Sequence, residues 1–189
     1  MSRTRTLIRR PITWVVLTAG VAAAAVVLAL FQPWKLWVDQ TVNEALPPSA
    51  VARPAPGAPA TAGAFGEPAV LARGTFISHE HATTGTARVV STSDGARYLR
   101  LDDLDTSNGP LLKVWLSDAS VISGAAGWRV FDHSRHVDLG PLKGNKGSQN
   151  YPLPADLDLT RYHSVTIWCA RFHVSFGAAD LTTSRGRQS

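Results

Sequence analysis

The chain has 189 residues and a formal net charge of +5 at pH 7, a balance that would suit a nucleic-acid-binding protein if the charge lay on a folded domain. Residues 67–181, however, hold 11 Lys and Arg against 12 Asp and Glu, and most of the basic excess lies near the two ends of the chain. Because a nucleic-acid reader carries its positive charge on the folded surface, the sequence excludes nucleic acid as a partner.

The N-terminal part of the sequence predicts a membrane span. Residues 1–11 form a basic tail, and residues 12–31, ITWVVLTAGVAAAAVVLALF, contain no charged side chain. A helix of that length would be about 30 Å long, which is the thickness of the hydrocarbon core of a bilayer. A cleaved signal peptide shares this pattern, but its apolar stretch is usually about 7–15 residues long and ends at an A-x-A-like site, and no such site closes the stretch 12–31. We therefore expect an uncleaved transmembrane helix.

The charges that flank this span predict its orientation. Four arginines precede it, whereas Lys35 with nearby Asp39 follows it. Since Lys and Arg are enriched on the cytoplasmic side of membrane spans, we expect a cytoplasmic N-terminus and an extracytoplasmic remainder. The chain would then be a single-pass protein of the cell membrane, with the lipid bilayer as one partner.

Two segments separate the predicted span from the folded part of the chain. In residues 32–46 most apolar side chains recur at helical spacing, which predicts a juxtamembrane helix that extends the span or lies in the interface. Residues 47–66, PPSAVARPAPGAPATAGAFG, are rich in Pro, Ala and Gly and show no core-forming pattern. They predict an extended linker that serves as a stalk.

Residues 67–181 predict one small all-β domain. Short alternating or apolar runs recur without a sustained helical period, and turn signals such as Asp94-Gly95 separate them. This pattern indicates a single antiparallel β-sandwich or barrel-like domain. Residues 182–189 are expected to be a disordered tail. The runs are RGTFIS, TARVVSTSDG, ARYLRLDDL, LLKVWLSD, VDLGPL, SVTIWC and RFHVSFG.

The chain has one cysteine, Cys169, and an unpaired thiol in an oxidising compartment needs an explanation. The alternation that ends at Cys169 and the one that begins at Phe172 have opposite parity, so a bulge or a tight turn at Ala170-Arg171 must separate two strands. Cys169 would then lie at a strand end, a more accessible place than mid-strand. Three roles stay open: a small buried hydrophobe, an intermolecular disulfide, and a redox thiol or ligand.

Composition limits the cofactors that Cys169 could hold. The sequence has no C-x-x-C-H motif for c-type haem attachment, and its only methionine is Met1, which excludes Met-ligated haem or copper on the outer side. Thiolate-ligated haem stays open, as does a Cys/His copper site that uses His173, four residues after the cysteine. His79 and His81, which a strand would point to one face, are further candidate metal ligands, although solvated or hydrogen-bonded histidines are commoner.

The sequence contains no motif of a hydrolase or a transferase. It has neither the G-x-S-x-G of a nucleophile elbow nor the residue order of a phosphate-binding loop. The stretch DLDTSNG, residues 103–109, departs from a calcium-binding loop at its sixth and twelfth positions. We therefore expect a domain that is not an enzyme of these classes.

Four stretches taken in chain order resemble the blocks of the DM-thirteen domain family: GTFISHEHATTGTARV, LRLDDLDTSNGPLLKVWLS, VDLGPLKGNKGSQNYPLP and SVTIWCARFHVSFGAADL. The resemblance covers about residues 70–181. It implies an extracytoplasmic β-rich module with an electron-transfer role for its characteristic cysteine, here Cys169, as a bare thiol or as the holder of a prosthetic group such as haem. The implied partner is an unidentified extracytoplasmic redox or surface protein. The alternative is a non-catalytic recognition or adhesion module in which Cys169 is structural.

Overall fold

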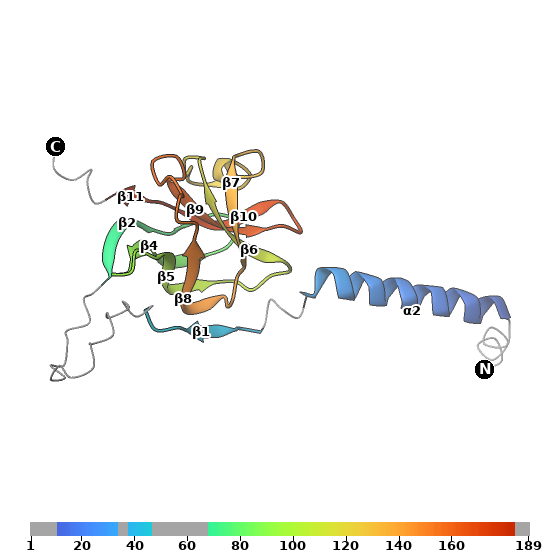
Figure 1. Ribbon diagram of the computed structural model, residues 1–189. Helices are drawn as coiled ribbons and strands as arrows, with labels where there is room; N and C mark the ends of the chain where they lie inside the picture. The colour runs from blue at the N-terminus through green and yellow to red at the C-terminus, as the bar shows by residue number, and fades with distance from the viewer. Residues whose placement is uncertain (1–10, 34–37, 47–67, 184–189) are drawn as a thin grey trace, which may run out of the picture.

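The computed structural model describes residues 11–33, 38–46 and 68–183 of the protein, which form one long helix and a β-domain (Figure 1). The helix lies at one end, and two sheets pack on each other in the domain. The elements in chain order are α2 (Pro11–Phe31), β1 (Thr41–Asn43), β2 (Ala69–Thr75), β3 (Ile77–Ser78), β4 (Thr83–Ser91), β5 (Arg97–Thr106), β6 (Leu112–Ser117), the short 3-10 helix η2 (Ala125–Gly127), β7 (His136–Pro141), β8 (Lys146–Leu153), β9 (Ser164–Cys169), β10 (Val174–Asp180) and β11 (Thr182–Thr183).

Helix α2 coincides with the predicted span and begins one residue earlier, at Pro11. It is long and apolar enough to cross a membrane, and none of its residues is buried against the β-domain. A helix that is apolar all round and has no buried face is suited to lipid rather than to water. The same length and composition are also found in N-terminal signal sequences.

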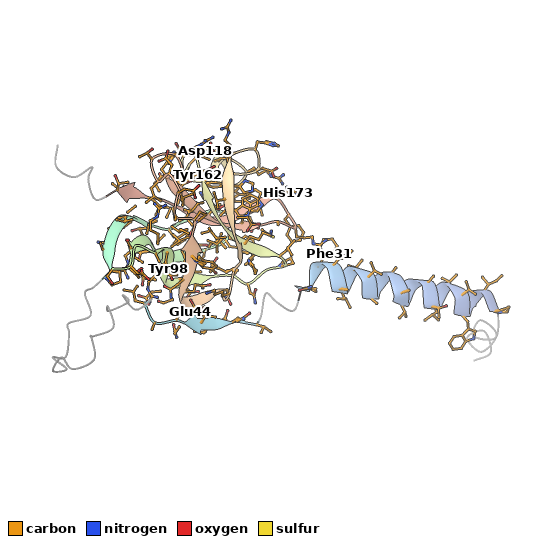
Figure 2. All side chains as sticks on the ribbon, viewed as in Figure 1. Phe31, Glu44, Tyr98, Asp118, Tyr162 and His173 are labelled. Atoms are coloured by element: carbon orange, nitrogen blue, oxygen red, sulfur yellow. The ribbon has the colours of Figure 1, made fainter. Side chains whose placement is uncertain are left out.

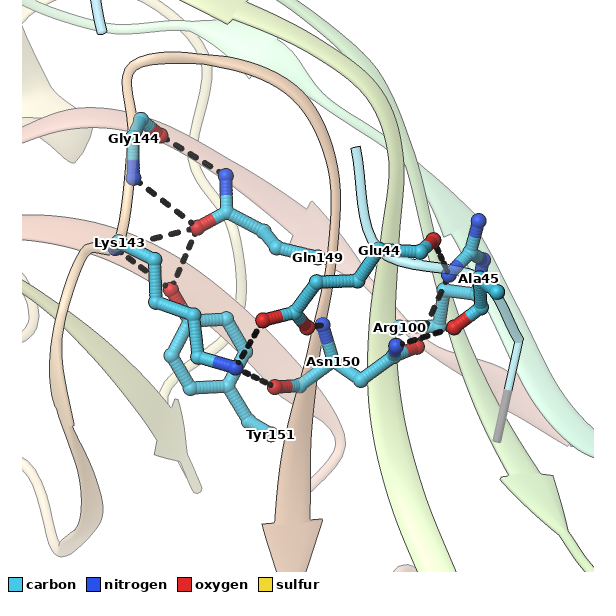
Figure 3. A network of polar contacts seen from close by, with 8 residues as sticks. All are labelled: Glu44, Ala45, Arg100, Lys143, Gly144, Gln149, Asn150 and Tyr151. Atoms are coloured by element: carbon cyan, nitrogen blue, oxygen red, sulfur yellow. Dashed lines mark hydrogen bonds and ion pairs between the residues drawn. The ribbon is translucent and has the colours of Figure 1, made fainter. Parts of the chain in front are cut away.

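Residues 41–43 form a strand, whereas the sequence predicts a juxtamembrane helix over 32–46, and residues 34–37 lie outside the described part of the chain. Strand β1 pairs in parallel with β8, with Thr41 opposite Lys146 and Asn43 opposite Ser148. The edge of β8 offers unpaired backbone groups, and β-branched residues suit the strand conformation, so pairing outweighs the helical spacing of the apolar residues. Figure 3 shows polar side chains that hold this segment on the domain.

Strand β1 changes the place of the predicted stalk. The chain already joins the sheet at residues 41–43, before the Pro- and Ala-rich stretch 47–66 begins. That stretch lies outside the described residues, as does the basic tail 1–10, and it connects β1 to β2 instead of the span to the domain. The other end of the domain is also extended, because Thr182 and Thr183 of the predicted tail pair with β2 as strand β11.

The two sheets form the predicted β-sandwich and do not close into a barrel. One is six-stranded with the order β1-β8-β5-β4-β2-β11, and the other is five-stranded with the order β3-β10-β9-β6-β7. Among the described strands all pairs are antiparallel except β1 with β8. The core lies between the sheets and includes Val89, Leu99, Leu101, Val114, Leu116, Val165, Ile167 and Cys169.

Strand β9 is buried on both faces, which explains why its sequence is apolar throughout. Ile167 and Cys169 point into the core between the sheets. Trp168 points to the outer face, where it packs with Trp115 and Phe131 in a second cluster. The segment between β6 and β7 therefore covers the outer face of the second sheet.

The junction of β9 and β10 contains the predicted tight turn. Strand β9 ends at Cys169, residues 170–173 form the turn, and β10 begins at Val174, directly opposite Cys169. His173 closes the turn with a φ of 54°, in the left-handed region. The sequence predicts that the second strand begins at Phe172. Phe172 instead belongs to the turn, because the reversal takes four residues. The register also shifts between Ser175 and Gly177 on β10.

Candidate functional site around Cys169

Cys169 is sealed inside the domain, although it lies at a strand end. Leu112 of β6 and Val174 of β10 flank it, and its side chain is 0% exposed. Its Sγ donates a hydrogen bond to the carbonyl oxygen of Pro110 at 3.2 Å. The predicted accessibility of the thiol is therefore wrong, because the chain between β5 and β6 covers the end of β9.

Burial is the main cause that raises the pKa of the Cys169 thiol above its ordinary value. The backbone amides of Phe172 and Arg171 oppose this effect, and the negative charge of Glu80 adds to it. A raised pKa keeps the thiol protonated at neutral pH. Since the thiolate is the nucleophile and the metal ligand, burial holds Cys169 in its less reactive form.

Residues 108–111 form a cap over the thiol. The side chain of Asn108 accepts a hydrogen bond from the Gly109 amide at 2.9 Å and donates one to the carbonyl of Val38 at 2.9 Å. Leu111 has a φ of 61°, and its carbonyl accepts a bond from Ala170 at 3.1 Å. The cap is thus joined both to the turn after Cys169 and to the segment that precedes β1.

Gly109 allows the cap to lie close to the core. A Cβ at this position would be 2.9 Å from Cζ of Phe176, closer than real side-chain contacts. Any other residue would move either the Phe176 ring or the cap that carries Pro110. Gly109 therefore has a steric role beyond that of a turn residue.

A cavity of about 440 Å³ lies beside the cap. Its walls are largely aromatic and apolar, and charged groups from two loops contribute to its lining. Pro110 and Val174 belong both to this lining and to the immediate surroundings of Cys169. The thiol is therefore one residue away from the cavity and does not line it. The lining residues are Glu80, His81, Gly109, Pro110, Trp128, Arg129, Phe172, Val174 and Phe176.

His79 and His81 do not point to one face, as a strand would require. Strand β3 ends at Ser78, and residues 79–81 bend. The Nδ1 of His79 lies 2.7 Å from Oγ of Ser175, a residue that also bonds to Thr166 on the outer face of the sheet. Burial lowers the pKa of His79, while the nearby Ile122 carbonyl has the smaller opposite effect. Its Nε2 is buried and makes no hydrogen bond within the described residues.

His81 lies on the other side of β10, at the cavity. Its ring packs on Phe176 with a centroid separation of 3.9 Å, and its Nε2 is 2.6 Å from Oε2 of Glu80. His81 and Glu80 thus form an acid–base pair in the lining of the cavity.

His173 is close to Cys169 in sequence, but the two side chains point in different directions. It is exposed, its Nδ1 lies 2.8 Å from Oδ1 of Asp132, and its ring meets Trp168 edge-on at 6.4 Å between centroids. Trp168 lies on the outer face of the sheet, whereas Cys169 points inward. The turn therefore separates the two side chains that a Cys/His copper site would need.

The two cofactors left open by the sequence do not fit this arrangement. Within residues 11–33, 38–46 and 68–183, no group of three or more His, Cys, Asp or Glu side chains could hold a metal ion. A thiolate ligand of haem would have to face the cavity, whereas the Cys169 thiol faces the Pro110 carbonyl. The metal-binding role of His79, His81 and His173 stays a prediction.

Sequence reasoning found the cysteine and the turn beside it but missed the cap and most of the cavity. Pro110, Trp128 and Arg129 come from two separate connections, and only the pairing of β6 with β9 brings the first of them to Cys169. The sequence Asn108-Gly109-Pro110 is typical of a turn, and residues 110 and 111 form one. It gave no sign that the proline carbonyl would meet a residue 59 positions later.

Comparison with known proteins identifies one family. A family model described as "Electron transfer DM13" matches residues 75–181. The match runs from the end of β2 to the residue after β10 and contains Cys169, its cap and the whole lining of the cavity. No curated protein and no solved structure matches the chain.

Proposed function

Because the chain belongs to the DM13 electron-transfer family, we propose that its β-domain exchanges electrons with a redox partner through the Cys169 thiol. We also propose that α2 is retained as the anchor of a single-pass protein of the cell membrane, with the domain on the extracytoplasmic side. The observation that carries the first part is the position of the only thiol in the chain. It lies inside the family-matched region, one carbonyl group away from a cavity of about 440 Å³.

The protonation of Cys169 bears on how this exchange would proceed. Burial raises the pKa of the thiol, so that removal of an electron from Cys169 must be accompanied by loss of its proton. The pair formed by His81 and Glu80 supplies acid–base groups at the cavity, and the charge of Glu80 is already felt by the thiol. The partner takes the electron and is an extracytoplasmic redox protein or a redox-active component of the membrane.

The anchor and its orientation are supported by α2 and by the charges around it. All residues of α2 remain unburied, and four arginines precede the span. Analysis of the intact mass of the membrane fraction tests retention of α2. Protease accessibility of the domain in intact cells tests the side on which it lies.

A second candidate function is a non-catalytic recognition module. The complete burial of Cys169 and the raised pKa of its thiol favour this function, because both features are typical of a cysteine that only fills space. In that case the cavity would be a recognition site and the thiol would be part of the core.

Voltammetry of the full-length protein in nanodiscs separates the two functions. We expect a redox couple in the wild type that is lost in Cys169→Ala. The matched control is Val165→Ala on the same face of the same strand, which loses core packing but keeps the thiol and the couple. A folded wild type without a couple would favour the recognition module. A couple that persists in Cys169→Ala would overturn the role of this thiol. A haem or blue-copper absorption band in the purified protein would show that Cys169 is a ligand and not a bare thiol.

A further inference from the structure

Helix α2 ends against the tip of the β-domain that contains Cys169 (Figures 1 and 2). The rings of Phe31, the last helical residue, and Phe172, in the turn after Cys169, are stacked with their centroids 5.9 Å apart. Gln32 then leaves the helix with a φ of 42°. The chain meets the domain again at Val38, whose carbonyl accepts the bond from Asn108. The helix exit and the cap over the thiol are therefore neighbours.

Exposed apolar side chains gather at this helix exit. The exposed fraction is 46% for Phe31, 56% for Val38, 55% for Leu111 and 44% for Phe172. We call these four residues the apolar rim. Direct contacts connect them: Phe31 stacks on Phe172, Val38 bonds to the cap that contains Leu111, and the Leu111 carbonyl bonds to the turn that contains Phe172.

The rim is suited to the surface of a bilayer. Apolar side chains gain free energy when they leave water, about 25 cal/mol for each Å² removed, and Phe and Leu are typical of the apolar face that interfacial segments bury in a bilayer. Arg171, which is exposed next to Phe172, can keep its guanidinium among lipid headgroups while its stem lies along the apolar surface. A span that ends at Phe31 places the bilayer directly beside these residues.

We propose that the apolar rim rests on the membrane, so that the end of the domain that holds Cys169 faces the bilayer. This inference relies on the anchoring role proposed for α2. Its occupant is lipid, because the rim surrounds the point where a membrane-spanning helix leaves the domain. On soluble domains, exposed apolar patches of this kind mark contact surfaces. Here the anchoring helix brings the apolar rim into contact with lipid.

The docked orientation determines which partners can approach the thiol. Pro110, whose carbonyl covers Cys169, directly precedes Leu111 of the rim, and Phe172 belongs to both the rim and the cavity. The cavity and the thiol therefore lie at the membrane side of the domain. The electron that Cys169 gives up would therefore pass to a redox component within the bilayer, and not to a soluble protein on the opposite side.

Depth measurements with a fluorescent label test this orientation. Leu111→Cys and Phe172→Cys are made in full-length Cys169→Ala, labelled with NBD and placed in nanodiscs of phosphatidylcholine and phosphatidylglycerol. We expect blue-shifted emission and quenching by a nitroxide on the lipid chains that is at least about twofold stronger than at the control position. Quenching that is equal at the rim and at the control position would overturn the proposal.

Val70→Cys provides the matched control. Val70 is an apolar residue of β2 with an exposed fraction of 36%. It pairs with Val90, which in turn pairs with Tyr98, and Figure 2 shows Tyr98 at the opposite end of the domain from Phe31. If Cys169→Ala fails to fold, the same labels are attached with Cys169 retained, and the labelled wild type measures the background from the buried thiol.

The outcome of this test is independent of the redox experiment. Quenching at the rim together with an absent redox couple would keep the docked orientation and remove the electron-transfer role of Cys169. A redox couple without quenching at the rim would keep that role and remove the orientation. Loss of α2 from the membrane-bound protein would remove the basis of the docking itself.

Discussion

The carboxylate of Glu44 binds Lys143 Nζ at 2.7 Å and thereby joins the segment after α2 to the connection between β7 and β8, 99 residues later (Figure 3). The second carboxylate oxygen of Glu44 accepts a bond from the Asn150 amide at 2.7 Å, and the Glu44 carbonyl accepts one from Arg100 at 3.0 Å. One residue thus makes contacts with β5, with β8 and with the loop before β8. The polar contacts of residues 38–46 hold the β1 segment on the domain.

Replacing Glu44 with alanine should lower the free energy of unfolding by about 1–2 kcal/mol, because the Asn150 amide and Lys143 lose their acceptors. Urea denaturation measures the change. The matched control is Asp156→Ala, an exposed carboxylate in the loop after β8, which should cost less than about 0.5 kcal/mol. Equal effects of the two variants would show that the network contributes nothing to stability.

Removal of β1 should destabilise the domain more strongly than the loss of Glu44 alone. A chain that begins at residue 67 lacks the parallel pairing with β8, the bond that the Gln40 amide donates to Oδ1 of Asn145 and the Glu44 contacts. We expect its free energy of unfolding to be about 2–4 kcal/mol lower than that of a chain that begins at residue 38. The exposed edge of β8 should also promote association, which light scattering detects. Two chains of equal stability would contradict the structural role of β1.

Asp102 should make the stability of the domain dependent on acid. Burial raises the pKa of this carboxyl, but hydrogen bonds from Arg88 and Arg100, both as short as 2.6 Å, outweigh it and hold the pKa below 3.8. A carboxyl whose pKa is lowered by folding stabilises the protein above its unfolded pKa, and this contribution is lost as the pH falls through the folded pKa. Denaturation midpoints between pH 5 and pH 2 should therefore fall less steeply in Asp102→Asn than in the wild type. Parallel curves would refute the assignment.

The cap over Cys169 should control the reactivity of the thiol. Because burial raises the pKa of Cys169 and the Pro110 carbonyl covers it, a maleimide should react slowly with the native protein and rapidly in denaturant. Gly109→Ala forces the cap away from Phe176 at a cost of about 1–3 kcal/mol, and the native labelling rate should rise by about tenfold.

Val89→Ala is the matched control for this labelling experiment, because Val89 is fully buried in β4, away from the cap. It should lower global stability by a similar amount with a smaller change in the native labelling rate, since opening of the cap is local. If both variants label at the same rate, the thiol becomes accessible only through global unfolding.

Those parts of the structure that depend on local sequence could be predicted. The sandwich follows from short alternating runs with turn residues between them, and the reversal after Cys169 follows from a change of parity within a few residues. The prediction that Phe172 begins the second strand was wrong, because parity does not distinguish a four-residue turn from a shorter one. The sequence predicts His79 and His81 on one face of a strand, but β3 ends at Ser78.

The parts that depend on pairing between distant segments could not be predicted. Strand β1 has three residues, and its partner β8 lies about a hundred positions later, so no local pattern reveals the parallel pairing. The burial of Cys169 likewise depends on Pro110, which arrives through the pairing of β6 with β9. A strand end appears accessible in a sequence because the segment that covers it belongs to another part of the chain.

The pairing of β1 also sets how far the domain can travel from its anchor. With β1 in place, residues 32–40 are all that separates the end of α2 from the sheet, a contour length of about 30 Å. If β1 were released, the linker between α2 and the sheet would run from residue 32 to residue 68, with a contour length of about 120 Å. The three residues of β1 and the carboxylate of Glu44 therefore limit the distance that the domain can move away from the end of α2.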